Sequence, residues 1–191
     1  MIRHLRPLLG NLLFLGAVSG VSLLVIMLAF RSCGLTPGQV QDEILLREMN
    51  IEAGEAYRAA RADEPGVVTL ENGLQVEMLH RGDGPVPDPE DRVRVHYEGR
   101  HLDGRVFDSS HERGSPAVIA VKDTIPGWRK VLTSMPEGSR AHLVVPHYLA
   151  YGEGRAGDNI GPAETLIFEV ELLEVLERPA DGATERQGDG S

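Results

Sequence analysis

Hydrophobic and polar positions follow three successive patterns along the chain, and the first is a long apolar run. Residues 8–30, which read LLGNLLFLGAVSGVSLLVIMLAF, contain no charged side chain. At about 1.5 Å of rise per residue, a helix of this length crosses a hydrocarbon core of about 30 Å. Arg3 and Arg6 precede the run, whereas the next basic residue beyond Arg31 is Arg47. This bias predicts a transmembrane anchor, with residues 1–7 in the cytoplasm and the rest of the chain outside it.

Two other interpretations of this segment stay open. A cleaved signal peptide has a shorter apolar region and small residues at the cleavage site, which Phe30-Arg31-Ser32 does not supply. A lipoprotein signal would place Cys33 after small or apolar residues, whereas Arg31 stands two positions before it. We therefore expect an anchor that stays attached.

The second pattern is helical and covers residues 36–62. Thr36-Pro37-Gly38-Gln39 is a typical helix start, with Thr as N-cap, Pro at the first helical position and Gln returning to the cap. Pro65-Gly66 stops the helix. Three arrangements fit: a solvated stalk, a surface that pairs with a second copy, or a helix packed on its own domain. The faces are rich in Glu and Arg, so we expect a stalk within 31–67 with a modest pairing seam. The seam is a narrow apolar stripe of Leu45, Met49, Ala53, Ala56, Tyr57 and Ala60.

The third pattern has a period of two and predicts strands between residues 68 and 177. Four shorter strand-like runs lie at 73–79, 104–110, 116–121 and 140–146, and Leu102-Asp103-Gly104 is a hairpin turn signal. Two longer runs alternate apolar and polar positions, with Val93, Val95 and Tyr97 against Arg94, His96 and Glu98, and Leu166, Phe168, Val170 and Leu172 against Thr165, Ile167, Glu169 and Glu171.

One segment inside this region keeps a helical period. It begins at Pro126 and places Trp128, Val131, Leu132 and Met135 on one face. One short helix among five or six strands predicts an antiparallel α+β domain, with that helix packed on a face of the sheet. The segment 178–191 has no apolar residue other than alanine, which predicts a disordered tail.

Composition and charge exclude several classes of function. The 191 residues carry 19 basic and 29 acidic side chains, and this net charge of −10 argues against a nucleic-acid partner. The single cysteine, Cys33, excludes an internal disulfide and a Cys-rich metal site. The sequence has no nucleophile motif and no phosphate loop, so we expect neither a metal nor another cofactor. Two pairs of histidines are each five residues apart: His96 with His101, and His142 with His147. On a strand this spacing places the two members of a pair on opposite faces, which does not suit a metal site.

Five blocks in order and near-typical spacing resemble the FKBP-type peptidyl-prolyl cis-trans isomerases. They are VHYEGRHLDGRVFDSS at 95–110, IPGW at 125–128, MPEGSR at 135–140, LAYGEGRAG at 149–157 and TLIFEVELL at 165–173. The resemblance covers 68–177 and implies a curved antiparallel sheet wrapped around one short helix. Upstream, residues 50–79 look like the bacterial Mip-like branch, in which N-terminal helices commonly pair into dimers.

The resemblance also implies a site. Its catalytic residues would be Asp108, Tyr151 and Ile125: the Ile125 backbone N–H and the Tyr151 hydroxyl would donate to substrate carbonyls, and Asp108 would orient neighbouring tyrosine hydroxyls. The substrate-binding residues would be Tyr97, Phe107, Trp128, Phe168 and Ile119, with the Trp128 indole as the pocket floor and Ile119 where a phenylalanine is common. From the residues alone, Trp128 is a core residue of the short helix, and Asp108 is a strand-end cap bonded to Ser109 or Ser110.

The implied activity is the acceleration of X–Pro isomerisation in the folding of exported proteins. The implied location is a bacterial inner membrane, with the domain in the periplasm or outside the cell. The expected partners are proline-containing polypeptides, the lipid bilayer through 8–30, and a second copy through 36–62. The alternative is a membrane-tethered chaperone or assembly factor whose pocket binds unfolded chains with little catalysis.

Overall fold

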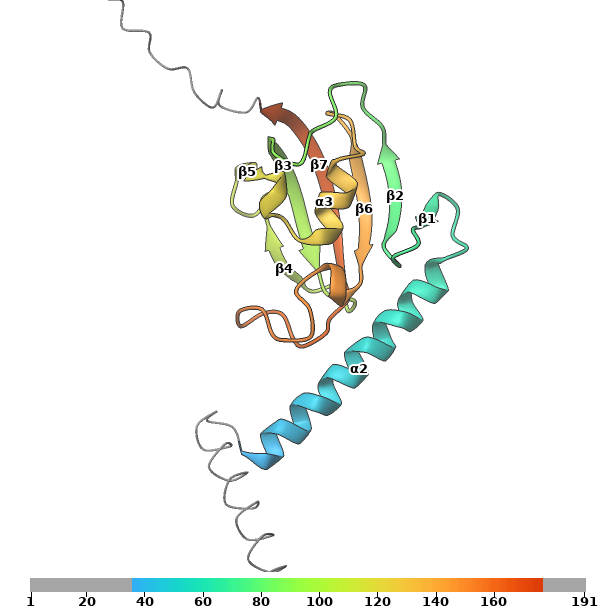
Figure 1. Cartoon of the computed structure of the whole chain (residues 1–191), viewed down its shortest axis with the longest axis vertical. Helices are drawn as coiled ribbons and strands as arrows, with labels where there is room; N and C mark the ends of the chain where they lie inside the picture. Colours follow the sequence, from blue (N-terminus) through green and yellow to red (C-terminus); the bar gives the residue numbers. More distant parts are fainter. Residues whose placement is uncertain (1–35, 177–191) are drawn as a thin grey trace, which may run out of the picture. The chain divides into compact units, whose positions relative to one another are not determined.

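The structure of the chain, a computed structural model, describes residues 36–176 (Figure 1). The expected anchor at 8–30 and the expected disordered tail at 178–191 lie outside the described residues. Between residues 36 and 176, no helix is both long and apolar enough to cross a bilayer. The chain divides into two compact units within its first described helix, after Leu45.

Helix α2 (Pro37–Arg61) begins with the expected capping box. The Thr36 backbone N–H donates to Gln39 Oε1 at 2.8 Å, and the Gln39 N–H donates to Thr36 Oγ1 at 3.3 Å. These bonds satisfy donors that the first turn of a helix otherwise leaves free. The helix ends at Arg61, shortly before the expected Pro-Gly stop, because the chain turns there and the Glu64 N–H donates to the Arg61 carbonyl at 3.1 Å.

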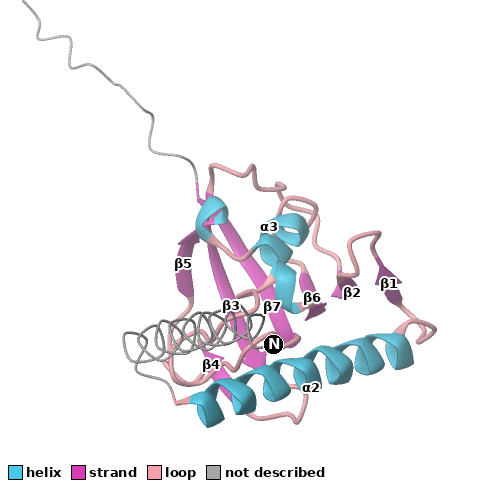
Figure 2. Cartoon of the chain, turned by 60° about the horizontal axis from the view of Figure 1, so that its bottom comes forward, coloured by secondary structure: helices cyan, strands magenta, loops and turns pink. Residues whose placement is uncertain are grey.

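The rest of the described chain is built on one antiparallel sheet in the order β1-β2-β6-β7-β3-β4, with β5 paired to β3 (Figures 1 and 2). The α+β class and the short helix α3 (Pro126–Leu132) are confirmed, and 3₁₀ helices η1 (Val121–Asp123) and η2 (His147–Leu149) flank it. The hydrophobic pattern alone did not predict the three-residue strand β1, because it is too short to show alternation. The strands are β1 (Val67–Thr69), β2 (Gln75–His80), β3 (Arg92–Arg100), β4 (Val106–Ser109), β5 (Ala117–Ala120), β6 (Arg140–Val145) and β7 (Leu166–Leu176).

Helix α3 lies on one face of the sheet and closes the main core there (Figure 1). All four apolar residues of its expected stripe are buried, from Trp128 to Met135. They pack with alternate residues of the central strands, as the period of two predicted. Gly127 permits this packing, because a Cβ atom there would lie 2.6 Å from Val145 Cγ1 of β6. The core includes Val93, Val95, Ala141, Leu143, Val145, Phe168, Val170 and Leu172.

The opposite face of the sheet is covered by another part of the chain, although the alternating pattern predicted that its residues would be exposed to solvent. Ile167 of β7 is only 7% exposed and Thr165, directly before β7, only 3%, and Gln75 and Val144 are buried as well. On this face, Val144 of β6 pairs with Gln75 of β2 on one side and with Ile167 of β7 on the other. The helix segment 46–61 packs on this face, because the Gln75 amide donates to a helix carbonyl and Thr165 contacts a helix glycine.

The expectation of a solvated stalk is therefore wrong for residues 46–61, which pack on their own domain. The side of the helix that contacts the domain carries Asn50, Gly54, Arg58 and Arg61, rather than the apolar stripe. Its contacts are made by polar side chains that reach backbone carbonyls and by a glycine that allows close approach. The stripe points to solvent instead: Met49 is 57% exposed, and Ala53, Ala56 and Ala60 are exposed.

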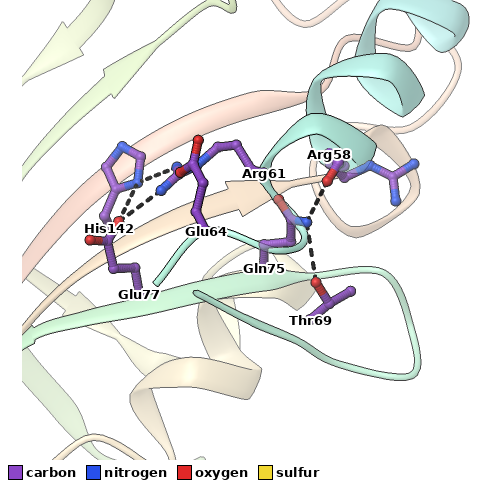
Figure 3. Close-up of polar contacts among 7 residues, drawn as sticks. All are labelled: Arg58, Arg61, Glu64, Thr69, Gln75, Glu77 and His142. Carbon is purple, nitrogen blue, oxygen red and sulfur yellow. Dashed lines mark hydrogen bonds and ion pairs between the residues drawn. The ribbon is translucent and has the colours of Figure 1, made fainter. Parts of the chain in front are cut away.

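Arg61 fastens the C-terminal end of this helix to the sheet (Figure 3). Its guanidinium donates to Glu64 at 2.8 Å, to Glu77 of β2 at 2.7 Å, and to His142 Nδ1 of β6 at 2.8 Å. Because an arginine can only donate, His142 accepts with an unprotonated Nδ1. Burial, and next the positive charge of Arg61, lower the pKa of His142 below its ordinary value.

Candidate functional site

A pocket of about 600 Å³ opens between the sheet, the start of α3 and the loop that follows η2. It brings together residues from β3, β4, β5 and β7 that are far apart in the sequence. All eight residues expected at a site line it: Tyr97, Phe107, Asp108, Ile119, Ile125, Trp128, Tyr151 and Phe168.

Four aromatic rings form the inner end of the pocket, each standing edge-on to the next. The ring centroids are 5.2 Å apart for Tyr97 and Trp128, 5.4 Å for Trp128 and Phe168, and 5.7 Å for Phe107 and Phe168. Such edge-to-face contacts are the favoured arrangement of aromatic pairs. Gly99 of β3 makes room for them, because a Cβ atom there would lie 2.5 Å from Phe107 Cζ and 3.0 Å from Phe168.

Trp128 belongs to the core and to the pocket at once. It is 5% exposed, packs within the core cluster, and also lines the pocket. The two interpretations of this residue, as helix anchor and as pocket wall, are therefore compatible. Pro126 at the first position of α3 sets the start of the helix, and so fixes where the indole lies.

Ile125, directly before α3, combines an apolar side chain with a free backbone donor. Its carbonyl accepts from the Arg129 N–H at 3.1 Å, in the first turn of the helix. Its own N–H has no acceptor within residues 36–176. Since Ile125 lines the pocket, this N–H can serve a carbonyl that enters there.

Asp108 is held by two partners at the rim of the pocket. The Tyr97 hydroxyl donates to Asp108 Oδ2 at 2.5 Å, and the Arg113 guanidinium pairs with Asp108 Oδ1. Among the described residues, neither Ser109 nor Ser110 bonds this carboxylate, so the strand-end cap interpretation is wrong.

Arg113 is a site residue that the sequence did not reveal. Its Nη2 donates to the Tyr97 hydroxyl at 2.9 Å, and its guanidinium carbon lies 5.3 Å from the centroid of the Tyr97 ring. Burial, and then the bond to Asp108, raise the pKa of the Tyr97 hydroxyl. The hydrogen bonds to Tyr97 and Asp108 raise the pKa of Arg113. Arg113 lies in a loop, where the hydrophobic pattern has no period that could identify a site residue. The only signal in the sequence is its place in the turn after β4, close to Asp108.

Tyr151 lies on the loop between η2 and β7, and 47% of it is exposed. Burial, and next the charge of Asp108, raise the pKa of its hydroxyl, so it stays a protonated donor at neutral pH. This hydroxyl has no hydrogen-bond partner in the described part of the chain. The expected orientation of tyrosine hydroxyls by Asp108 is thus found for Tyr97 and not for Tyr151.

The pocket continues beyond the aromatic end along β5. Arg92 of β3 and Ala120 of β5 pair with each other and form part of the outer wall. The sequence pattern does not define the register of this strand pair. Within the described ranges, no group of three or more His, Cys, Asp or Glu side chains is placed to hold a metal ion. The lining residues beyond the eight expected at the site are Arg92, Val118, Ala120, Asp123 and Thr124.

Comparisons with known proteins agree with this geometry. Residues 84–173 match the family model described as FKBP-type peptidyl-prolyl cis-trans isomerase. The FKBP-type 22 kDa peptidyl-prolyl cis-trans isomerase of Escherichia coli K12 is 51% identical over 123 residues, which are 64% of this chain and 60% of that protein. The peptidyl-prolyl cis-trans isomerase Mip of Coxiella burnetii is 46% identical over 129 residues, or 68% of this chain and 56% of that one. The chain therefore spans less than two thirds of the length of each of these relatives.

A solved structure covers the same region. The crystal structure of a peptidyl-prolyl cis-trans isomerase from Pseudomonas syringae pv. tomato superposes with a TM-score of 0.63 at 38% identity, over 68% of this chain and 96% of that one.

Proposed function

This chain belongs to the FKBP-type peptidyl-prolyl cis-trans isomerases, and from that membership we propose that it accelerates the isomerisation of X–Pro bonds in polypeptides. The observation that carries the proposal is the pocket itself. Four edge-on aromatic rings form an apolar end, and two donors without partners in the described residues, the Ile125 N–H and the Tyr151 hydroxyl, belong to residues that line it.

The chemistry requires neither a nucleophile nor a strong acid. Rotation about an X–Pro bond is slow because it breaks amide resonance, with a barrier of about 18–20 kcal/mol. The planar amide is polar and well solvated, whereas the twisted amide has less charge separation. A proline ring bound against Trp128 would place the amide in a site poor in water, which favours the twisted form relative to the planar one.

The donors would then hold the peptide in the twisted geometry. The Ile125 N–H and the Tyr151 hydroxyl would each bind a substrate carbonyl, so that less entropy is lost in reaching the transition state. Asp108 would act through Tyr97: with Arg113 it fixes the tyrosine ring that stands against Trp128. Tyr97, Phe107, Phe168 and Ile119 would form the walls around the proline and its neighbours.

Two proposals concern the rest of the chain. Residues 8–30 would anchor it in a bacterial inner membrane, with the isomerase domain in the periplasm or outside the cell, where it would assist the folding of exported proteins. The uncharged run of that segment, after Arg3 and Arg6, supports this proposal. A second copy would bind through the exposed stripe of α2, and the exposure of Met49 supports that pairing.

Refolding of a protein limited by prolyl isomerisation separates catalysis from simple binding. The proposal predicts that the full chain accelerates this slow phase at substoichiometric concentration. It also predicts that Asp108→Ala, Tyr151→Phe and Trp128→Ala all reduce the acceleration. A tethered chaperone would lose its effect in Trp128→Ala and keep it in Tyr151→Phe, which removes a donor and leaves the four rings in place, and that outcome would replace catalysis with binding.

A further inference from the structure

We propose that Asn50 of helix α2 is a positioning residue for the reaction, because it holds the loop that carries Tyr151. This loop, residues 150–165, connects η2 to β7, and we call it the Tyr151 loop. The inference rests on the proposed function, and it adds that a helix outside the pocket sets the position of a donor inside it.

Three residues on one side of α2 contact the Tyr151 loop. The Asn50 side-chain amide donates to the Pro162 carbonyl at 2.8 Å. One turn further along the helix, a Cβ atom on Gly54 would lie 2.2 Å from Thr165 Oγ1, so the helix backbone and the loop are in close contact there. One turn earlier, Arg47 pairs with Glu153 at 3.2 Å. That ion pair is solvent-exposed and contributes little, so Asn50 is the main polar contact.

The carbonyl that Asn50 binds stands next to a strained residue. Ala163 has a φ of 52°, in the left-handed region that side chains other than glycine rarely adopt, and its side chain is fully buried. Such a conformation persists only where the surroundings determine it. The Asn50 bond fixes the peptide before Ala163. On the other side, Glu164 pairs with the buried imidazole of His101 at 2.7 Å.

The anchored end of the loop is linked to the pocket by two routes. The first runs through His101, whose ring stands 5.3 Å from that of Phe107, a wall of the pocket. The second runs through the loop itself: Ala156 and Ile160 exchange backbone hydrogen bonds of 3.0 and 3.3 Å, and Ile160 belongs to the core. The loop is thus folded on itself between Asn50's contact and Tyr151.

The Tyr151 hydroxyl depends on this support. Within residues 36–176 it bonds no other side chain, so the course of the loop determines where it lies. Release of the Pro162 carbonyl should therefore disturb Tyr151 and leave Asp108 and Tyr97, which are held by Arg113, in place.

The test compares Asn50→Ala with Arg58→Ala in the full chain. Arg58 is a matched control because it is on the same helix and also donates to a domain carbonyl, that of Gly73, which is not part of the Tyr151 loop. Isomerisation of a Leu-Pro peptide and hydrogen exchange of residues 150–165 are measured for both variants, each with and without Tyr151→Phe.

We expect Asn50→Ala to lower kcat about three- to fivefold with little change in KM, because a misplaced donor costs transition-state binding. Asn50→Asp, which keeps the shape without the donor, should do the same. The loss should disappear in the Tyr151→Phe background, since the two changes act on one group. Exchange in 150–165 should rise for the Asn50 variants alone.

Three results would overturn the inference: an equal loss of kcat in the Tyr151→Phe background, an equal loss in Arg58→Ala, or unchanged exchange in the loop. An inactive wild-type chain would instead contradict the proposed function. In that case the exchange measurement alone decides whether Asn50 holds the loop.

Discussion

The Tyr97 hydroxyl donates to the Asp108 carboxylate at 2.5 Å, and this pair holds a tyrosine ring that is nearly perpendicular to Trp128, with the ring centroids 5.2 Å apart. Arg113 bonds both members of the pair from the solvent side. The carboxylate is therefore a support for one wall of the pocket, and it need not exchange protons with a substrate.

The first prediction follows from that pair. Asp108→Ala leaves a partly buried tyrosine hydroxyl without its acceptor and frees Arg113, so kcat/KM for a Leu-Pro peptide should fall about tenfold. Asp103→Ala is the matched control, because Asp103 also pairs with an arginine, Arg105, at 2.7 Å, but in an exposed turn. Equal activity of the two variants would contradict the role given to Asp108.

The second prediction concerns the space that Gly99 leaves for the aromatic rings. Gly99→Ala places a methyl group 2.5 Å from the edge of Phe107, so the rings must move. Overpacking of this kind costs about 1–3 kcal/mol of stability, and substrate binding should weaken with it. Gly154→Ala, at a position with nothing within 4 Å, should leave both quantities unchanged. Chemical unfolding and peptide kinetics measure the two effects.

The third prediction concerns the contact between α2 and the sheet. Alanine normally stabilises a helix relative to glycine by about 0.5–1 kcal/mol. Gly54→Ala should instead destabilise the protein, because the new Cβ atom would lie 2.2 Å from Thr165 Oγ1. Gly38→Ala is the control on the same helix, since the nearest atom there is 4.0 Å away. A gain of stability in Gly54→Ala would show that the helix does not pack on Thr165.

The fourth prediction is a loss of stability in acid that depends on His142. Its folded pKa lies below the ordinary value of 6.5, so the unfolded chain takes up the proton first as the pH falls. Stability should be full above pH 6.5 and should decline below it, towards the folded pKa. Protonation of His142 would also remove an acceptor of Arg61. The negative charges of Glu77, Glu169 and Glu64 oppose the lowering of the His142 pKa.

His142→Gln should flatten this decline in the unfolding midpoint, whereas the exposed His80→Gln should not. Part of the decline should remain in His142→Gln, because burial also lowers the pKa of His147. An unchanged pH profile in His142→Gln would exclude His142 as its cause.

The fifth prediction tests the pairing of two copies through the stripe of α2. Met49→Glu places a charge in the stripe and should convert a dimer of the full chain in detergent to a monomer, as measured by sedimentation. Val68→Glu is the control, since Val68 is also 57% exposed but lies on β1. A monomeric wild-type chain, or a dimer that persists in Met49→Glu, would contradict pairing through this face.

Much of the domain could be predicted because its core is local and periodic. The stripe from Trp128 to Met135 and the alternation around Val95 reflect burial on one face, which repeats at 3.6 and 2 residues. The same reasoning failed at Thr165 and Ile167, where a second layer covers the sheet. That layer is not visible in the pattern, because its helix packs through Asn50, Gly54 and Arg58 rather than through an apolar face.

The site was accessible from the sequence only through its resemblance to a family. Composition and spacing predicted that Trp128 is a core residue. They also predicted that Asp108 caps the end of a strand, and no such cap is found among the described residues. Arg113 and the outer wall at Arg92 stayed hidden, because they depend on loop conformation and on the register between β3 and β5. Neither property follows from the hydrophobic pattern of a single sequence.

The most direct test of the isomerase activity is the cis-to-trans conversion of a short Leu-Pro peptide, with and without the full chain in detergent. We expect a rate that rises in proportion to the protein concentration and falls in Tyr151→Phe. A rate equal to the uncatalysed one, in a protein whose Trp128 fluorescence reports a buried indole, would contradict this expectation.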